Sequence, residues 1–134
     1  MIFGAPKKSK IVIIDDEPSF LSIFSTALGK ENFEVKTFSD PQEALKNIVG
    51  EKPDVILLDI KMPGLDGFQV FEYLKKDFGK NLPKVLFLTS LGETISGTAI
   101  DNHFAKTIGA NGYIHKTDDL NNIVKKVKET IENQ

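Results

Sequence analysis

Two predicted strands of this chain end in carboxylates, and this feature has the clearest chemical meaning. The apolar run 55–58 ends at Asp59, and the run 11–14 ends at Asp15 and Asp16. Runs of this kind are typical of strands buried in a parallel sheet, and open parallel sheets place their ligands at the carboxyl ends of such strands. A single aspartate at a strand end is more often a helix cap. Two such strands together predict an acidic pocket that binds a cation.

A hydroxyl and an ammonium group follow two further predicted strands. Thr89 comes directly after the apolar run 85–88, and Lys116 follows the short run 113–115. Taken alone, Thr89 is readily explained as a helix cap, and Lys116 as a solvated loop lysine. Together with the carboxylates they favour phosphoryl chemistry, because oxygen ligands suit Mg²⁺ and a hydroxyl and an ammonium would hold phosphoryl oxygens. We therefore expect Asp59 to be a nucleophile toward a phosphoryl group.

Strands and helices alternate along the whole chain, without a repeat or a low-complexity tract. The predicted strands cover 11–14, 34–38, 55–58, 85–88 and 113–115, and the predicted helices cover 18–28, 41–49, 67–78, 92–109 and 118–131. The helix over 92–109 has the weakest pattern, because Gly97 interrupts it. Five strand–helix units predict a parallel sheet covered by helices on both faces, and so an α/β domain.

Composition limits the classes of protein to which the chain can belong. It has 134 residues, of which 40% are hydrophobic and 27% charged. These values are typical of one globular domain with a real core. A formal net charge of −2 argues against direct nucleic-acid binding and against an anionic membrane surface. The chain has no cysteine, which excludes disulfides and thiolate sites. His103 and His115 lack a surrounding cluster of metal ligands.

The ends of the chain give expectations about location and domain organisation. No apolar stretch approaches the ~20 residues that span a bilayer, so we expect no membrane insertion. Residues 1–9 lack the apolar centre of a signal peptide, and we interpret them as a flexible lead-in to one domain over 10–134. We expect a cytoplasmic location. Little sequence follows Ile131, so we expect no separate output domain.

The order of these residues resembles the receiver domain of two-component response regulators, over about residues 10–131. The matching residues are the Asp15-Asp16 pair, Asp59 followed by Met62-Pro63 and Asp66-Gly67, Thr89, and Lys116 with Tyr113 three residues before it. Each of these is weak by itself, but all of them occur in order at matching strand ends. The resemblance implies a flavodoxin-like doubly wound α/β sandwich, with five parallel strands in the order 2-1-3-4-5 and five helices.

The resemblance also implies a function in phosphorelay signal transduction. A sensor histidine kinase or a histidine phosphotransfer protein would pass a phosphoryl group to Asp59, with Mg²⁺ as the cofactor. Asp16 and Asp59 would ligate Mg²⁺ directly, together with the backbone carbonyl of Lys61, while Asp15 would act largely through water. The domain would be a phosphoacceptor that assists its own phosphorylation and dephosphorylation, and not a conventional enzyme.

Further residues take roles from the same resemblance. Thr89 and Lys116 would contact the phosphoryl oxygens, and Tyr113 would turn inward when Thr89 moves toward the phosphate, which changes the surface that binds a downstream protein. Phe20 and Leu21 would contact the phosphodonor. They lie in the first turn of the predicted helix 18–28, and both cannot face inward fully alongside Ile23 and Phe24 of the same helix. The alternative is that both are core residues.

Two positions depart from the family pattern. The family lysine is usually followed by proline in a cis peptide bond, and here Thr117 follows Lys116. A cis bond before a residue other than proline costs about 3–4 kcal/mol, which leaves the geometry of Lys116 open. The stretch between Thr89 and Lys116 is also longer than expected. It is either a longer loop, which we favour, or a surface for an unusual partner.

Three other functions compete with this interpretation. A phosphatase of the haloacid dehalogenase type needs a second aspartate two residues after the nucleophile, where this chain has Lys61. A flavodoxin-like cofactor binder needs a phosphate-binding loop after its first strand, where Asp15 and Asp16 would repel phosphate. The remaining alternative is a receiver-like interaction module that works without phosphorylation.

Overall fold

The computed structural model describes residues 8–90, 94–95, 98–99 and 102–133 of the chain. Its central feature is a parallel sheet in the order β2-β1-β3-β4-β7. The five strands are β1 (Lys10–Ile14), β2 (Glu34–Phe38), β3 (Val55–Asp59), β4 (Lys84–Thr89) and β7 (Gly112–His115). In order along the chain this is 2-1-3-4-5, which confirms the predicted topology.

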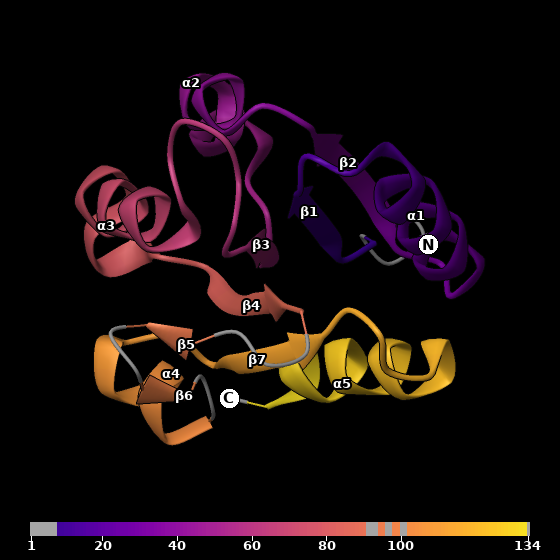
Figure 1. Cartoon of the computed structure of the whole chain (residues 1–134). Helices are drawn as coiled ribbons and strands as arrows, with labels where there is room; N and C mark the ends of the chain where they lie inside the picture. Colours follow the sequence, from indigo (N-terminus) through magenta and orange to yellow (C-terminus); the bar gives the residue numbers. More distant parts are fainter. Residues whose placement is uncertain (1–7, 91–93, 96–97, 100–101, 134) are drawn as a thin grey trace.

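In the part of the chain that the structure describes, five α-helices connect and cover these strands. They are α1 (Pro18–Lys30), α2 (Pro41–Glu51), α3 (Gly67–Phe78), α4 (Asn102–Ile108) and α5 (Leu120–Glu132), with a 3₁₀ turn η1 (Gly79–Asn81) after α3. Helices α1 and α5 lie on one face of the sheet, and α2, α3 and α4 lie on the other (Figure 1). This is the three-layer α/β sandwich that the alternation of elements predicts.

The sheet separates two hydrophobic cores, because neighbouring residues of a strand point to opposite faces. In β1, Val12 and Ile14 pack toward α2 and α3, while Ile11 and Ile13 pack toward α1 and α5. All four side chains are fully buried. A strand buried on both faces accounts for the unbroken apolar run that precedes Asp15 in the sequence.

The segment before β7 differs from the sequence prediction. In place of one helix over 92–109, the described residues form a two-residue antiparallel pair, β5 (Thr94–Ile95) with β6 (Thr98–Ala99), followed by the short helix α4. The prediction of a long helix here was wrong. Threonine and isoleucine favour extended backbone, and Gly97 lies inside the interval that the helix would have needed. Gly92 and Gly97 themselves lie outside the described residues.

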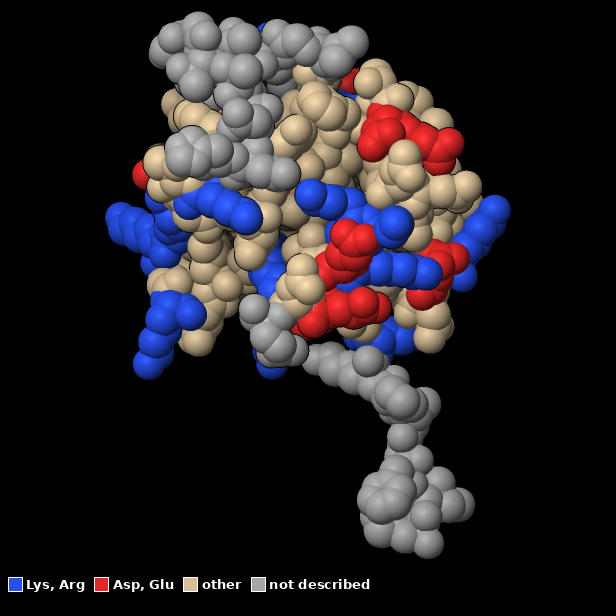
Figure 2. Space-filling view, turned by 90° about the horizontal axis from the view of Figure 1, so that it is seen from below, with Lys and Arg blue, Asp and Glu red and all other residues tan. Residues whose placement is uncertain are grey.

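Charges of both signs share one face of the domain (Figure 2). On the face shown in Figure 2, lysine and acidic side chains are interspersed, and neither sign of charge covers that face alone. None of the helices in the described part of the chain is both long and apolar enough to span a membrane. Residues 1–7 of the predicted lead-in lie outside the described residues.

Candidate functional site

The register of the sheet brings the predicted site residues to one edge. Ile14 pairs with Leu58, so the next residues, Asp15 and Asp59, leave neighbouring strands together. On the other side of β3, Asp59 pairs with Leu88, which precedes Thr89. Asp15, Asp59 and Thr89 expose 0%, 2% and 1% of their surface. Polar groups are usually solvated, so three buried polar side chains at one sheet edge mark this place as the candidate site.

The backbone path of the loop after β3 requires a glycine at position 67. A Cβ at this position would lie 2.4 Å from the backbone oxygen of Asp59, closer than atoms can approach. The Gly67 amide donates a hydrogen bond to the carbonyl of Ile60 at 2.7 Å, and α3 begins at once. Asp66 caps this helix in a reciprocal pair of hydrogen bonds with Gln69. The Asp66-Gly67 pair therefore fixes the backbone directly after Asp59.

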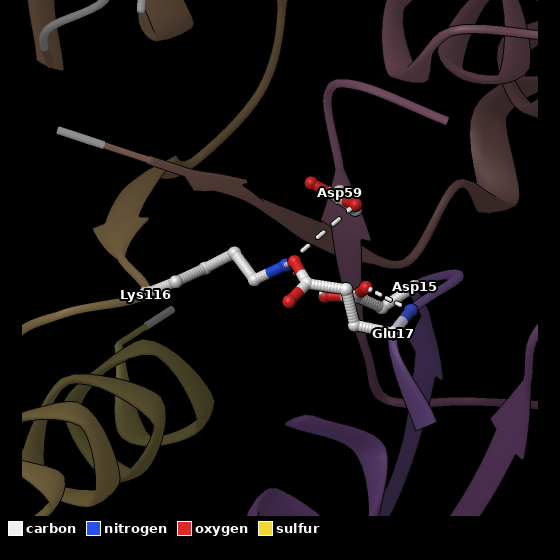
Figure 3. Close-up of polar contacts among 4 residues, drawn as sticks. All are labelled: Asp15, Glu17, Asp59 and Lys116. Carbon is white, nitrogen blue, oxygen red and sulfur yellow. Dashed lines mark hydrogen bonds and ion pairs between the residues drawn. The ribbon is translucent and has the colours of Figure 1, made fainter. Parts of the chain in front are cut away.

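Lys116 enters the pocket from the end of β7 (Figure 3). Its Nζ lies 2.8 Å from Oδ2 of Asp15 and 3.8 Å from Oδ2 of Asp59, and it also pairs with Glu17. The Lys116 side chain is 7% exposed, and its ammonium lies 4.5 Å from the ring centroid of Phe20. The Lys116–Thr117 peptide bond is trans. The ammonium reaches the carboxylates with threonine in the place of the family's proline.

The electrostatics of the pocket are dominated by burial of like charges. Burial, together with the neighbouring charges of Asp15 and Asp16, raises the pKa of Asp59 to about 8, against the opposing effect of Lys116. Burial also raises the pKa of Asp15. For Lys116, burial lowers the pKa, but the interactions with Asp15 and Glu17 outweigh it and the net shift is upward. The pocket therefore has more negative charge than one ammonium offsets.

A divalent cation fits this excess of negative charge. Asp15, Glu17 and Asp59 each offer one carboxylate oxygen, and these oxygens all lie within 4.8 Å of one another. Oδ2 of Asp15 is buried, and the Lys116 ammonium pairs with it at 2.8 Å. A donor set made only of oxygens suits Mg²⁺ better than a softer metal.

The structure brings together some of the predicted metal ligands and adds another residue. Asp15 and Asp59 meet, while Asp16 is half-buried and lies outside the cluster of close oxygens, and Lys61 is exposed. Glu17 is the residue that the sequence prediction missed. Its amide donates to Oδ1 of Asp15 at 2.9 Å, and its side chain pairs with Lys116. The available signal was its place directly after the acidic pair.

Contacts connect Thr89 to Lys116 and, through His115, to Tyr113. The Lys116 amide donates to the Thr89 carbonyl at 2.8 Å, which ties the ends of β4 and β7 together. The Thr89 hydroxyl lies 3.1 Å from Nδ1 of His115, and the half-buried ring of Tyr113 meets the His115 ring edge-on, with centroids 5.0 Å apart. His115 is the second residue at this edge to which the sequence prediction gave no role.

The arrangement of α1 corrects the expectation for its apolar residues. Phe20 and Leu21 are both buried, with 9% and 8% of their surface exposed, while Ile23 is 55% exposed. The apolar pair therefore does not form an exposed patch, because the helix turns Ile23 outward and both members of the pair inward. Contact of Phe20 and Leu21 with a phosphodonor stays a prediction.

Comparison with known proteins extends this picture. The family model described as the response regulator receiver domain matches residues 11–128. The chain is 38% identical over 109 residues to a probable transcriptional regulator, ycf27, of Guillardia theta, covering 81% of this chain and 40% of that protein. It is 34% identical over 119 residues to the alkaline phosphatase synthesis transcriptional regulatory protein PhoP of Bacillus subtilis (strain 168), covering 89% of this chain and 47% of that protein. The chain thus spans less than half the length of these relatives.

Solved structures show the same fold. The chemotaxis protein CheY4 of Vibrio cholerae superposes with a TM-score of 0.79 at 23% identity, covering 92% of this chain and 99% of that one. The BeF3-activated N-terminal receiver domain of RstA from Klebsiella pneumoniae gives a TM-score of 0.78 at 27% identity, covering 93% of this chain and all (100%) of that one. With its acidic pocket at the carboxyl ends of the strands and the family match over residues 11–128, this chain belongs to the response regulator receiver domains.

Proposed function

We propose that the chain accepts a phosphoryl group on the carboxylate of Asp59. The observation that carries this proposal is the position of Asp59 at the end of β3, buried among acidic groups, with the Lys116 ammonium 3.8 Å from its Oδ2. An oxygen of Asp59 would form the new bond to phosphorus while the bond between phosphorus and the donor breaks. Lys116 is placed to pair with an oxygen of the incoming group as that group develops contact with Asp59.

A cation is part of this proposal because the pocket is short of positive charge. Mg²⁺ would offset the repulsion between the carboxylates and the phosphoryl group. We assign direct ligation to Asp16, Asp59 and the backbone carbonyl of Lys61, and contact through water to Asp15. The support is chemical: the donors are all oxygens, and the charge of Asp16 already acts on Asp59. Glu17 would then position Lys116 and would not ligate the cation, because its carboxylate pairs with that ammonium.

The ion pairs of Lys116 suggest that the cation binds before the phosphoryl group arrives. In the structure the ammonium pairs with Asp15 and Glu17. The proposed phosphoryl transfer would require the same ammonium to pair with a phosphoryl oxygen. A cation near Asp15 would release Lys116 toward the phosphoryl group, since both positive charges compete for the same carboxylates. We propose that Thr89 contacts the phosphoryl group from β4 and that Tyr113 responds to its movement.

Receiver domains are phosphorylated by histidine kinases, and we propose such a kinase or a histidine phosphotransfer protein as the donor for this chain. The output would be a change in the surface that binds a downstream protein. Both curated relatives are named as regulators of transcription, and the chain covers less than half of each. A pull-down that compares beryllofluoride-treated with untreated protein would identify the partner. A cytoplasmic location belongs to the same proposal and is tested by cell fractionation.

Labelling with a small phosphodonor tests the acceptor directly. Incubation with acetyl phosphate and Mg²⁺ should give an acyl phosphate that is detected by intact mass and removed by hydroxylamine. The Asp59→Asn variant should give none, because an amide is not a nucleophile toward phosphorus. Asp77→Asn is a matched control, since Asp77 is an exposed aspartate of α3, and it should label like the parent. Equal labelling of the Asp59→Asn variant and the parent would contradict the assignment, and an unlabelled parent would favour the phosphorylation-independent module.

A further inference from the structure

His115 stands between the two residues of the proposed switch. The β4–β7 register pairs Thr89 with His115, and the Thr89 Oγ1 lies 3.1 Å from His115 Nδ1. On its other side the imidazole meets the ring of Tyr113 edge-on, at 84° between the ring planes. Thr89 is 1% exposed, so water hardly reaches its hydroxyl, and within the described part of the chain the imidazole is the hydrogen-bonding partner of that hydroxyl.

The Thr89 hydroxyl has one proton to donate, and two acceptors require it at different times. The proposed function requires the hydroxyl to donate its hydrogen bond to an oxygen of the phosphoryl group. In the structure the hydroxyl is within hydrogen-bonding distance of a ring nitrogen that, in one neutral tautomer, is an acceptor. We propose that His115 is a positioning residue of the switch: its Nδ1 accepts a hydrogen bond from the Thr89 hydroxyl in the resting domain, and Thr89 breaks this bond to donate to the phosphoryl group.

A cavity beside His115 leaves space for the imidazole to rotate after Thr89 has left it. The cavity, of about 200 Å³, lies between β7 and α5, and it is lined in part by Tyr113, His115, Asp118, Asn122 and Lys126. The Asn122 amide and the Lys126 ammonium carry the donors that can satisfy the ring nitrogen that Thr89 leaves. The bond between Thr89 and His115 therefore links the phosphoryl site to the face formed by β7 and α5.

This inference rests on the proposed function, but its first test needs no variant beyond one that assigns signals. Two-dimensional ¹⁵N–¹H spectra of the imidazole rings report which ring nitrogen holds the proton, and His103→Gln assigns the signals because the chain has two histidines. At a pH of about 8, above the range where histidine ordinarily titrates, His115 should be the tautomer with its proton on Nε2. Adding beryllofluoride and Mg²⁺ should shift the Nδ1 signal. A proton on Nδ1, or an unchanged Nδ1 signal, overturns the proposal.

A pair of variants separates the hydrogen bond from the packing of the ring. His115→Phe keeps an aromatic ring against Tyr113 but removes the acceptor, and His115→Asn keeps an acceptor close to the position of Nδ1. Since a buried hydrogen bond is lost on binding in the parent, His115→Phe should bind beryllofluoride about 3- to 10-fold more tightly. His115→Asn should stay close to the parent. In a Thr89→Val background, which has no hydroxyl, His115→Phe should change the affinity little.

The outcomes distinguish this inference from the proposed function. If beryllofluoride does not bind the parent in a way that depends on Asp59, the proposed function is wrong. If it binds the parent and His115→Phe equally, or binds the phenylalanine variant more weakly, only the role of His115 is wrong. An effect of His115→Phe that persists in the Thr89→Val background also contradicts it, because the imidazole would then act through packing against Tyr113.

Discussion

Nζ of Lys116 lies 2.8 Å from Oδ2 of Asp15, although the strands that precede them, β7 and β1, are separated in the sheet by β3 and β4. The lysine side chain thus crosses the carboxyl ends of the two strands that carry Asp59 and Thr89. A cation from the chain's own sequence pairs with the carboxylate at the far side of the pocket. This contact leads to the first prediction.

Lys116→Met should destabilise the metal-free domain and make it depend more strongly on Mg²⁺. Removing one partner of a buried ion pair typically costs about 3–5 kcal/mol, because the remaining charge stays buried without compensation. A divalent cation replaces the missing positive charge, so Mg²⁺ should restore part of the free energy of unfolding. Urea unfolding with Mg²⁺ or with chelator measures both effects. A variant that gains no more from Mg²⁺ than the parent would show that Lys116 and the metal do not share these carboxylates.

Asp59→Asn should reduce the dependence of stability on pH in the absence of metal. The pKa of Asp59 is raised to about 8 in the folded domain, against an ordinary value of about 3.9 for an unfolded aspartate. The folded state therefore holds its proton more tightly. This stabilisation is fully present below the unfolded pKa and is lost as the pH rises through the folded pKa.

The measurement is the free energy of unfolding in chelator between about pH 4 and pH 9. The parent should lose stability across this interval, and the asparagine variant should exceed the parent at the alkaline end by about 1–3 kcal/mol. The variant should still lose some stability as the pH rises, since burial raises the pKa of Asp15 as well. Parallel curves for the two proteins would mean that Asp59 is not buried among like charges.

Asp16→Asn should weaken Mg²⁺ binding more than Glu17→Gln does. We assign Asp16 to direct ligation, whereas the Glu17 carboxylate is engaged by Lys116 and its side chain is 56% exposed. The two substitutions remove the same charge from adjacent positions, so they form a matched pair. Isothermal titration with Mg²⁺ gives the affinities. The reverse order would favour the cluster of Asp15, Glu17 and Asp59 as the ligand set.

Gly67→Ala should be strongly destabilising, while Gly50→Ala should not. A Cβ at Gly67 would lie 2.4 Å from the backbone oxygen of Asp59 and 2.8 Å from the Cα of Ile60, whereas a Cβ at Gly50 meets nothing within 4 Å. We expect a loss above about 2 kcal/mol for the first variant, and a gain of up to about 1 kcal/mol for the second because alanine favours a helix. Chemical unfolding compares them. Similar values for both would mean that the loop after β3 can move away from Asp59.

Ile23→Ala and Phe20→Ala should affect phosphorylation differently. Ile23 is 55% exposed on α1. Its loss should therefore slow transfer from a kinase and leave labelling by acetyl phosphate unchanged. The Phe20 ring lies beneath the Lys116 ammonium, so its loss should slow both reactions. Rates with each donor give the comparison. If Phe20→Ala slowed only the kinase reaction, the predicted donor contact at Phe20 would be supported over its role under Lys116.

The strand-end residues of the site could be predicted because apolar runs locate buried strands and parallel strands share one carboxyl edge. Asp59, Thr89 and Lys116 are placed by that rule alone. Glu17 could not be assigned in this way, since its pairing depends on how far the Lys116 side chain reaches across the sheet. His115 was missed for a similar reason, because its partner is set by the β4–β7 register.

Helix orientation was harder to predict from the sequence. A helix with apolar residues at 20, 21, 23 and 24 has too wide a stripe to decide which of them faces outward, and packing against the sheet turns Ile23 toward solvent. The interval 92–109 was mispredicted because a weak helical pattern and residues that favour extended backbone overlap there. In such intervals tertiary contacts decide between helix and strand, and a single sequence does not show these contacts.

The burial of Asp15 and Asp59 side by side has a consequence for how this domain would evolve. A random search for greater stability, carried out without Mg²⁺, should repeatedly replace Asp59, because the substitution removes its repulsion with Asp15 and leaves the ion pair between Lys116 and Asp15 in place. Such variants would be more thermostable and unable to signal. Positions where selection for stability and selection for activity choose opposite residues would thus outline the site without any knowledge of its chemistry.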